Sequence, residues 1–238
     1  MRNLYSTILL ALTFVIVENV SAQITVNKSV LEFSADQKIQ DIEIFNSGDF
    51  KIYLDLKVAE IVNPEKADPE RVELSDPRTA AVLVTPQQVM VPAGQRKRVR
   101  VILREVAETH DHVYRLAIKP FTGNVKVDSD EGASKTSAIK VLLGYDLLLL
   151  SRPQDLQPAL EVSRTEKEIT FTNNGNTNIL LRRIMQCRKD TSECEELQPN
   201  RLYAGETLTL ALPMEGRADS FPVEVWQAVG LKCSRGVF

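Results

Sequence analysis

Apolar and polar residues alternate with a period of two along most of the chain, and the 3.6-residue period of a helix is scarce. Turn-forming clusters separate the alternating segments, among them Asn46-Ser47-Gly48-Asp49, Pro92-Ala93-Gly94 and Asn173-Asn174-Gly175-Asn176. Many short strands at regular spacing predict an all-β protein of the sandwich type rather than an α/β fold. We therefore expect two immunoglobulin-like β-sandwich domains, with a hinge near Arg152 to Asp155.

The pattern has one irregularity near its start. Ile24 and Val26 alternate in one phase, whereas Leu31 and Phe33 alternate in the other. The phase changes within residues 27–29. Such a slip is typical of a β-bulge, so we expect one first strand with a bulge there.

The most apolar strand-like run covers residues 139–153, with the sequence IKVLLGYDLLLLSRP. In its first half Ile139, Val141 and Leu143 share one face of the expected strand. A strand this apolar must be buried in its own fold, covered by a partner or left exposed as an aggregation hazard. We interpret these three residues as a partner-binding strand, with an ordinary buried strand as the alternative.

The first 22 residues have the features of a secretory signal peptide. Arg2 gives a basic start, Leu9 to Val17 an apolar core, and Val20-Ser21-Ala22 a small-residue cleavage site before Gln23. The apolar stretch is short for a membrane span, although a retained anchor is the alternative. No later apolar run approaches about 20 residues. We therefore expect no stable membrane insertion and a location outside the cytoplasm.

The charge of the chain argues against nucleic acid as a partner. The formal net charge is -3, so the chain has no broad basic field of the kind that binds nucleic acid. A local basic cluster, Arg96-Lys97-Arg98 with Arg100, alternates with Val99 and is typical of the solvated face of a strand.

The three cysteines predict one short disulfide. Cys187 and Cys194 can bridge a tight hairpin in an oxidising compartment, which leaves Cys233 unpaired, although the sequence permits any of three pairings. No CxxC spacing or nearby histidine completes a metal site. His110 and His112 could face one way on a strand as ligands, but are more typical of a polar loop. We expect no metal.

Enzyme motifs are missing from the sequence. It contains no Gly-x-Ser-x-Gly, no P-loop and no Gly-x-Gly-x-x-Gly. We therefore expect a binding protein with no cofactor, rather than an enzyme.

Several motifs together resemble the PapD-like periplasmic chaperones of the chaperone–usher pilus pathway. They are Pro92-Ala93-Gly94-Gln95, Tyr114-Arg115-Leu116, the run ending at Arg152-Pro153, Asn173-Asn174-Gly175-Asn176 and Arg201-Leu202-Tyr203-Ala204-Gly205. The resemblance covers nearly the whole chain after the signal peptide. It implies a signal peptide at 1–22, an N-terminal domain at 23–152 and a C-terminal domain at 153–238, arranged as a boomerang.

The resemblance also implies a mechanism. In this family the last strand of the first domain is lent to a pilus or fimbrial subunit that lacks a strand, and the chaperone delivers the subunit to an outer-membrane usher. By this analogy Ile139, Val141 and Leu143 would fill the groove of the subunit in the periplasm. Leu147 and Leu149 would instead fill the core of the chaperone itself.

The sequence departs from the family at the subunit anchor. The two basic residues that usually hold the C-terminal carboxylate of the subunit fall on Val30 and Leu148 here. Candidate replacements are Lys28 and Arg152. The family uses the latter arginine in an inter-domain ion network, so the resemblance predicts an ion pair between Arg152 and Asp111.

Two alternative functions remain at this point. One is a structural or adhesive β-sandwich protein of the cell surface, and the other is a PapD-like domain protein that binds a different ligand. A pilin would need an N-terminal donor extension, whereas strand-like pattern begins here at Ile24, directly after the cleavage site. The exposed strand also makes a self-capping homodimer plausible for the free protein.

Overall fold

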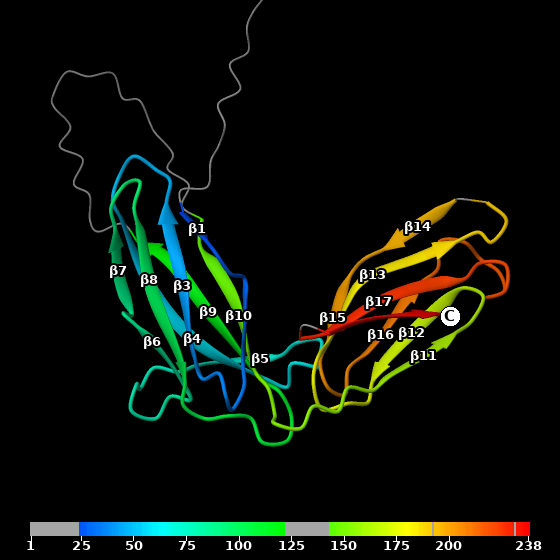
Figure 1. The fold of residues 1–238 in the computed structure, drawn as a ribbon, viewed down its shortest axis with the longest axis horizontal. Helices are drawn as coiled ribbons and strands as arrows, with labels where there is room; N and C mark the ends of the chain where they lie inside the picture. Colours follow the sequence, from blue (N-terminus) through cyan, green and yellow to red (C-terminus); the bar gives the residue numbers. More distant parts are fainter. Residues whose placement is uncertain (1–23, 122–142, 192, 231) are drawn as a thin grey trace, which may run out of the picture.

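A computed structural model describes residues 24–121, 143–191, 193–230 and 232–238. Within these ranges the secondary structure consists of β-strands, which confirms the predicted all-β class. Two sandwiches form a V, and the chain passes from one to the other at its apex (Figure 1). No helix in the described part of the chain is long and apolar enough to cross a membrane.

The first sandwich has two sheets that enclose one core. One sheet has the order β1 (Ile24–Val26), β3 (Ile39–Asn46), β8 (Arg96–Leu103) and β6 (Val82–Thr85). The other has the order β2 (Val30–Phe33), β10 (Tyr145–Ser151), β9 (His112–Phe121), β4 (Ile52–Val62) and β5 (Glu70–Glu73), with β7 (Gln88–Val91) beside β4. The alternation predicts the inward faces correctly: Leu54, Val99 and Leu116 are all fully buried in this core.

The second sandwich has its own core. Its smaller sheet contains β11 (Leu160–Arg164), β12 (Glu168–Asn173) and β16 (Thr207–Ala211). The larger sheet has the order β14 (Cys194–Leu197), β13 (Ile179–Cys187), β17 (Val223–Val229) and β18 (Lys232–Val237), with β15 (Asn200–Leu202) beside β13. Phe171, Leu181 and Val225 lie in the core between these sheets.

The expected bulge in the first strand is wrong. β1 pairs with β3 in one sheet, whereas β2 pairs with β10 in the facing sheet, so the chain crosses the sandwich at residues 27–29. Asn27 marks the end of β1, because its backbone N–H donates to the Glu43 carbonyl and its side-chain Oδ1 accepts from the Glu43 N–H at 2.8 Å. The change of phase therefore records a change of sheet.

A buried asparagine closes the turn after β3. Asn46 is fully buried, and its Nδ2 donates to the carbonyls of Phe50 (2.7 Å) and Val91 (2.9 Å). Its Oδ1 accepts from the N–H of Gly48 at 3.0 Å. Its own backbone carbonyl accepts from the N–H of Gly94, a residue with φ of 67°. Such a positive φ favours glycine, which explains this residue in Pro92-Ala93-Gly94-Gln95.

The second sandwich repeats this arrangement after β12. The Nδ2 of buried Asn173 donates to the carbonyls of Thr177 (2.8 Å) and Leu202 (3.1 Å), and its Oδ1 accepts from the Gly175 N–H at 3.0 Å. Its backbone carbonyl accepts from the N–H of Gly205, which has φ of 82°. The two turn motifs of the sequence are therefore equivalent parts of two similar domains.

Candidate functional site

The first feature of the candidate site is the edge of β10. On one side, all seven residues of β10 pair with β9 in antiparallel register. On the other side, β2 runs parallel to β10 but pairs only with Leu148 to Ser151. Among the described residues, the backbone edge of Tyr145 to Leu147 therefore has no neighbouring strand on the β2 side.

The predicted partner-binding residues lie at and before the start of β10. Ile139 and Val141 fall outside the described residues. Leu143 precedes β10 by two residues and is 54% exposed. Leu147 and Leu149 are buried in the core of the first sandwich, as expected. The described part of the apolar run therefore separates into core residues at its end and an exposed leucine at its beginning.

The opposite face of β10 looks into the cleft between the sandwiches. Leu148 and Leu150 cluster there with Val113 of β9, and Val30 and Tyr203 pack against them. Tyr203 directly follows β15 of the second domain, so apolar contact across the cleft joins the two sandwiches.

One row of side chains crosses this cleft-facing sheet. Leu148 lies opposite Val30 on β2 and opposite Arg115 on β9. Residues directly opposite each other in a sheet project from the same face. The two positions where a basic residue was expected are therefore neighbours in space, and both are apolar. Arg115 supplies a guanidinium one strand further along the same row.

Arg115 lies at a pocket of about 410 Å³ between the domains. Tyr203 lines this pocket beside Arg115, and burial raises the pKa of Tyr203, so its hydroxyl is neutral. Arg71 forms two hydrogen bonds with Asp146 at 3.0 and 2.9 Å. Arg115, in contrast, has no carboxylate within ion-pair distance among the described residues. In the sequence, Arg115 is distinguished only by its place in Tyr114-Arg115-Leu116, because its neighbours in the row come from distant strands.

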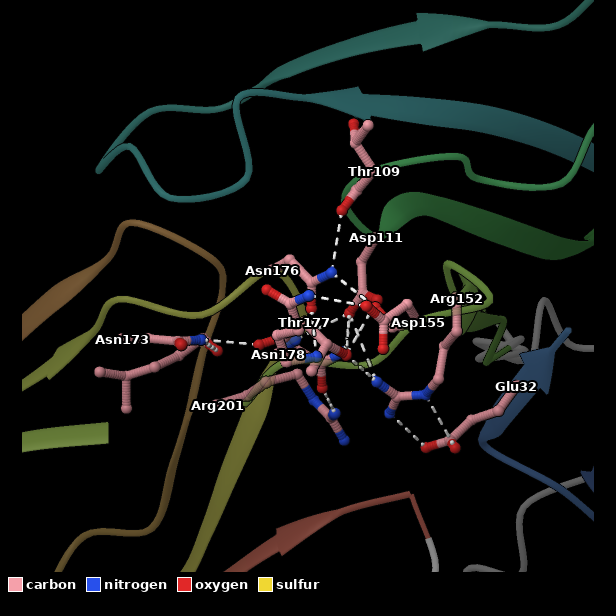
Figure 2. A network of polar contacts seen from close by, with 12 residues as sticks. Glu32, Thr109, Asp111, Arg152, Asp155, Asn173, Asn176, Thr177, Asn178 and Arg201 are labelled. Carbon is pink, nitrogen blue, oxygen red and sulfur yellow. Dashed lines mark hydrogen bonds and ion pairs between the residues drawn. The ribbon is translucent and has the colours of Figure 1, made fainter. Parts of the chain in front are cut away.

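The second feature is a polar network at the apex of the V (Figure 2). Arg152 follows β10, and its side chain is only 6% exposed. Its Nε and Nη2 donate to the carboxylate of Glu32 at 3.1 and 3.0 Å. Its Nη1 donates to Thr177 Oγ1 and lies 3.4 Å from Asp111 Oδ2. The predicted partners Asp111 and Arg152 are thus brought together, and all three guanidinium nitrogens are engaged.

Asp111 connects the network to the second domain. Its carboxylate accepts hydrogen bonds from Thr177 Oγ1 at 2.9 Å and from the backbone N–H of Asn178 at 2.8 Å. The side-chain amide of Asn178 also donates to Asp111 and accepts from Arg201. Burial lowers the pKa of Arg201. Thr177 and Asn178 directly follow the turn Asn173-Asn174-Gly175-Asn176 that the sequence predicts, but their contact with Asp111 joins residues more than 60 positions apart.

The other candidate anchor, Lys28, lies in the crossing between β1 and β2. It is exposed, and its Nζ donates to Gln40 Oε1 at 3.2 Å. The nitrogens of Arg152 are already occupied, whereas Lys28 has no carboxylate within ion-pair distance among the described residues. Arg115 is a further cationic group in the cleft, in the same row as Val30 and Leu148.

The paired cysteines lie in the larger sheet of the second sandwich, whereas Cys233 lines a pocket at the domain junction together with Glu32 and Arg152. Cys187 and Cys194 are opposite each other on β13 and β14 and form a disulfide. Cys233 on β18 is a free, exposed thiol. In the part of the chain that the structure describes, no group of three or more histidine, cysteine, aspartate or glutamate residues could hold a metal ion. His112 begins β9 and its Nδ1 lies 3.6 Å from Glu60.

The chain also matches a known protein family. The family model described as "Pili and flagellar-assembly chaperone, PapD N-terminal domain" matches residues 23–157. The chain belongs to this family. Its role is that of a chaperone, which confirms the expectation that it is not an enzyme.

Individual proteins are also similar to this chain. A protein of Escherichia coli that is named as a CFA/I fimbrial subunit is 27% identical over 139 residues, which span 57% of this chain and 57% of that protein. The structure of the class 5 fimbriae chaperone CfaA matches with a TM-score of 0.62 at 18% identity, over 90% of this chain and 98% of that chain.

A further match is to a complex of the Salmonella enterica pilin SafA with the chaperone SafB. Its TM-score is 0.62 at 14% identity, over 92% of this chain and 97% of that chain. At these identities the structural matches show the fold, two immunoglobulin-like sandwiches in a boomerang, as the sequence predicted.

Proposed function

We propose that the protein is a periplasmic chaperone that binds pilus or fimbrial subunits through the edge of β10 and the residues before it. It would lend this strand to a subunit whose own sheet is incomplete, and then deliver the subunit to an outer-membrane usher. Residues 1–22 would direct it to the periplasm as a signal peptide. Family membership supports the chaperone role, and the CfaA and SafB structures supply the analogy.

The observation that carries the proposal is the open edge at the start of β10. An incoming strand can pair with the open backbone edge at the start of β10, and alternate side chains of the lent segment can enter its partner's groove. Burying Ile139, Val141 and Leu143 would contribute about 1.5–3 kcal/mol each before the costs of association. An edge of this kind also needs protection in the free protein, which supports self-association when no pilus protein is bound.

We further propose that Arg115 takes part in anchoring the carboxylate of the subunit. It projects into the cleft in the same row as Val30 and Leu148, the positions where the family places its basic pair. Its neighbour Tyr203 offers a hydroxyl donor in the same pocket, and Arg115 has no carboxylate within ion-pair distance among the described residues. An arginine fork can hold a carboxylate by two parallel hydrogen bonds. Lys28 is the second candidate, whereas Arg152 is committed to Glu32 and Asp111.

The test is co-expression in a bacterial periplasm with candidate fimbrial subunits, followed by pull-down of the chaperone. We expect wild type to capture and stabilise one of these subunits, and an Ile139/Val141/Leu143→Ser variant to lose that capture. A matched variant, Ile39/Val72/Val237→Ser, exchanges three exposed apolar residues elsewhere and should capture as wild type does. Equal capture by both triple variants would refute the role of this strand.

Two further arms of the same experiment address the anchor. Arg115→Leu should lower the captured amount while leaving the fold intact, and Lys28→Gln should have the smaller effect. An Arg115→Lys variant retains the charge and should recover part of the capture. If the amount captured by Arg115→Leu equals that of wild type, the anchor lies elsewhere.

A further inference from the structure

A second pocket lies at the junction of the two domains, away from Arg115. Its volume is about 680 Å³, which falls within the range of roughly 300–1,000 Å³ that is usual for small-molecule sites. Apolar side chains from the hinge, β11, β13 and β17 form one part of its wall: Leu156, Pro158, Leu160, Ile179 and Val229. Glu32 and Arg152 of the polar network border it on the side of the first domain.

One buried polar atom at this pocket has no hydrogen-bond partner among the described residues. Gln227 donates from Nε2 to Ser234 Oγ at 3.1 Å, but its Oε1 is buried and has no donor among the described residues. Buried acceptors of this kind are rare in native proteins and call for a partner. A ligand that donates a hydrogen bond at this position would supply one.

The charge of the pocket favours an anion. Arg152 is neutralised by its ion pair with Glu32. Lys232 is an exposed residue that lines the pocket, and it has no carboxylate within ion-pair distance in the described chain. Glu32, Arg152 and Lys232 together therefore carry a net charge of one positive unit beside the apolar wall of the pocket.

From these features we propose that the pocket binds a small amphiphile with an apolar body, a hydrogen-bond donor and an anionic head. The body would lie against Leu156, Leu160 and Val229, the donor would reach Gln227 Oε1, and the head would meet Lys232. A ligand that fills the pocket would also lie against Glu32 of the first domain and Arg152 of the hinge, so it would contact both sandwiches. Its binding would therefore stabilise one angle between them. This site does not depend on the proposed subunit-binding strand.

The probe that tests the site is anilinonaphthalene sulfonate, which carries an aromatic body, a secondary amine N–H and a sulfonate. Titration of the full chain by fluorescence should give saturable binding with one site. Lys232→Glu should weaken this binding about three- to tenfold, as expected for reversing one exposed charge, and Lys232→Arg should retain it. Lys97→Glu, a remote exchange of an exposed lysine, controls for net charge and should have no effect.

A neutral dye separates the apolar and charged parts of the site. Phenylnaphthylamine has the same body without the sulfonate, so its affinity should not respond to Lys232→Glu. Leu156→Ser should weaken both dyes, whereas Tyr53→Ser, on an exposed aromatic of the first sandwich, should weaken neither. Non-saturable binding, or saturable binding that responds only to Tyr53→Ser, would overturn the proposal. Circular dichroism of each variant verifies that the fold is retained.

Discussion

At the scale of single residues, Asn46 and Asn173 show how two domains solve the same problem. Each ends a strand, turns the chain with a glycine two residues later and donates from Nδ2 to the end of another strand. An alanine at either position would leave buried carbonyls and a glycine N–H without partners. The side-chain amide therefore acts as a fixed link between a turn and a distant strand.

We predict that Asn46→Ala and Asn173→Ala each lower the free energy of unfolding by about 2–3 kcal/mol, because several buried groups lose their partners. Asn46→Ala should destabilise the first sandwich and Asn173→Ala the second. Urea denaturation followed by hydrogen exchange of each domain measures this. Asn174→Ala, in the same turn but exposed, is the control and should be nearly neutral. Equal stability of all three variants would contradict the assigned role.

The sequence predicts the turns at these residues but not the buried amides. Asn-x-Gly is a local signal, because the turn needs only neighbouring residues. The inward direction of the amide depends on the carbonyls of Val91 and Leu202, which are 45 and 29 positions away. Contacts of that range have no local signature in one sequence.

At the scale of elements, the alternation of apolar and polar residues predicts which face of a strand is buried, but it does not predict which strands are paired. The basic cluster on β8 is a solvated face, as expected, and β3 supplies its partners: Arg100 pairs with Asp41 at 2.8 Å and Arg98 lies 3.8 Å from Glu43. The crossing between β1 and β2 was mistaken for a bulge, because a period of two cannot identify the sheet to which a strand belongs. The same limit hides the row that Arg115 shares with Leu148 and Val30.

The ion pair between β5 and β10 predicts a pH effect. The Arg71 guanidinium holds the pKa of Asp146 below its ordinary value of 3.8. A lowered carboxyl pKa stabilises the fold above that ordinary value, and the stabilisation is lost as the pH falls through the lowered one. Both side chains are more than 40% exposed, so the contribution should be at most about 1 kcal/mol.

Asp146→Asn should therefore be slightly less stable than wild type at about pH 7, and the difference should vanish at a pH low enough to protonate Asp146 in the folded protein. Urea denaturation at both pH values measures it, and an Arg71→Gln/Asp146→Asn cycle isolates the pair. Asp49→Asn, an exchange in the exposed turn after β3, should show no such dependence. A difference that persists unchanged at low pH would exclude this ion pair as its source.

At the scale of the whole molecule, Arg152 and Asp111 set the relation between the sandwiches. The sequence resemblance predicted this pair, but not Glu32, Thr177 and Asn178, which complete it. The pair alone would bury two charges at high cost. The additional hydrogen bonds offset that cost, and they come from both domains.

Replacing Arg152 with alanine should loosen the angle between the domains and destabilise the protein by about 3–5 kcal/mol, because Asp111 keeps its buried charge without the cation. Small-angle scattering should show a broader distribution of distances, and calorimetry should show domains that unfold more independently. Arg104→Ala, which removes an exposed arginine bonded within the first sandwich, is the control. Unchanged scattering and stability of Arg152→Ala would contradict this view of the apex.

The short parallel contact between β2 and β10 has a consequence for any strand that adds to the molecule. The backbone N–H of Leu148 already donates to the carbonyl of Ser29 at 3.0 Å. Because β2 pairs with Leu148 to Ser151, an added strand cannot pair with these residues on that side. Pairing can extend outward from Leu147 but not inward past it. β2 thus acts as an end stop that fixes where an added strand must finish, and a chain longer than the open edge would have to turn away at that point.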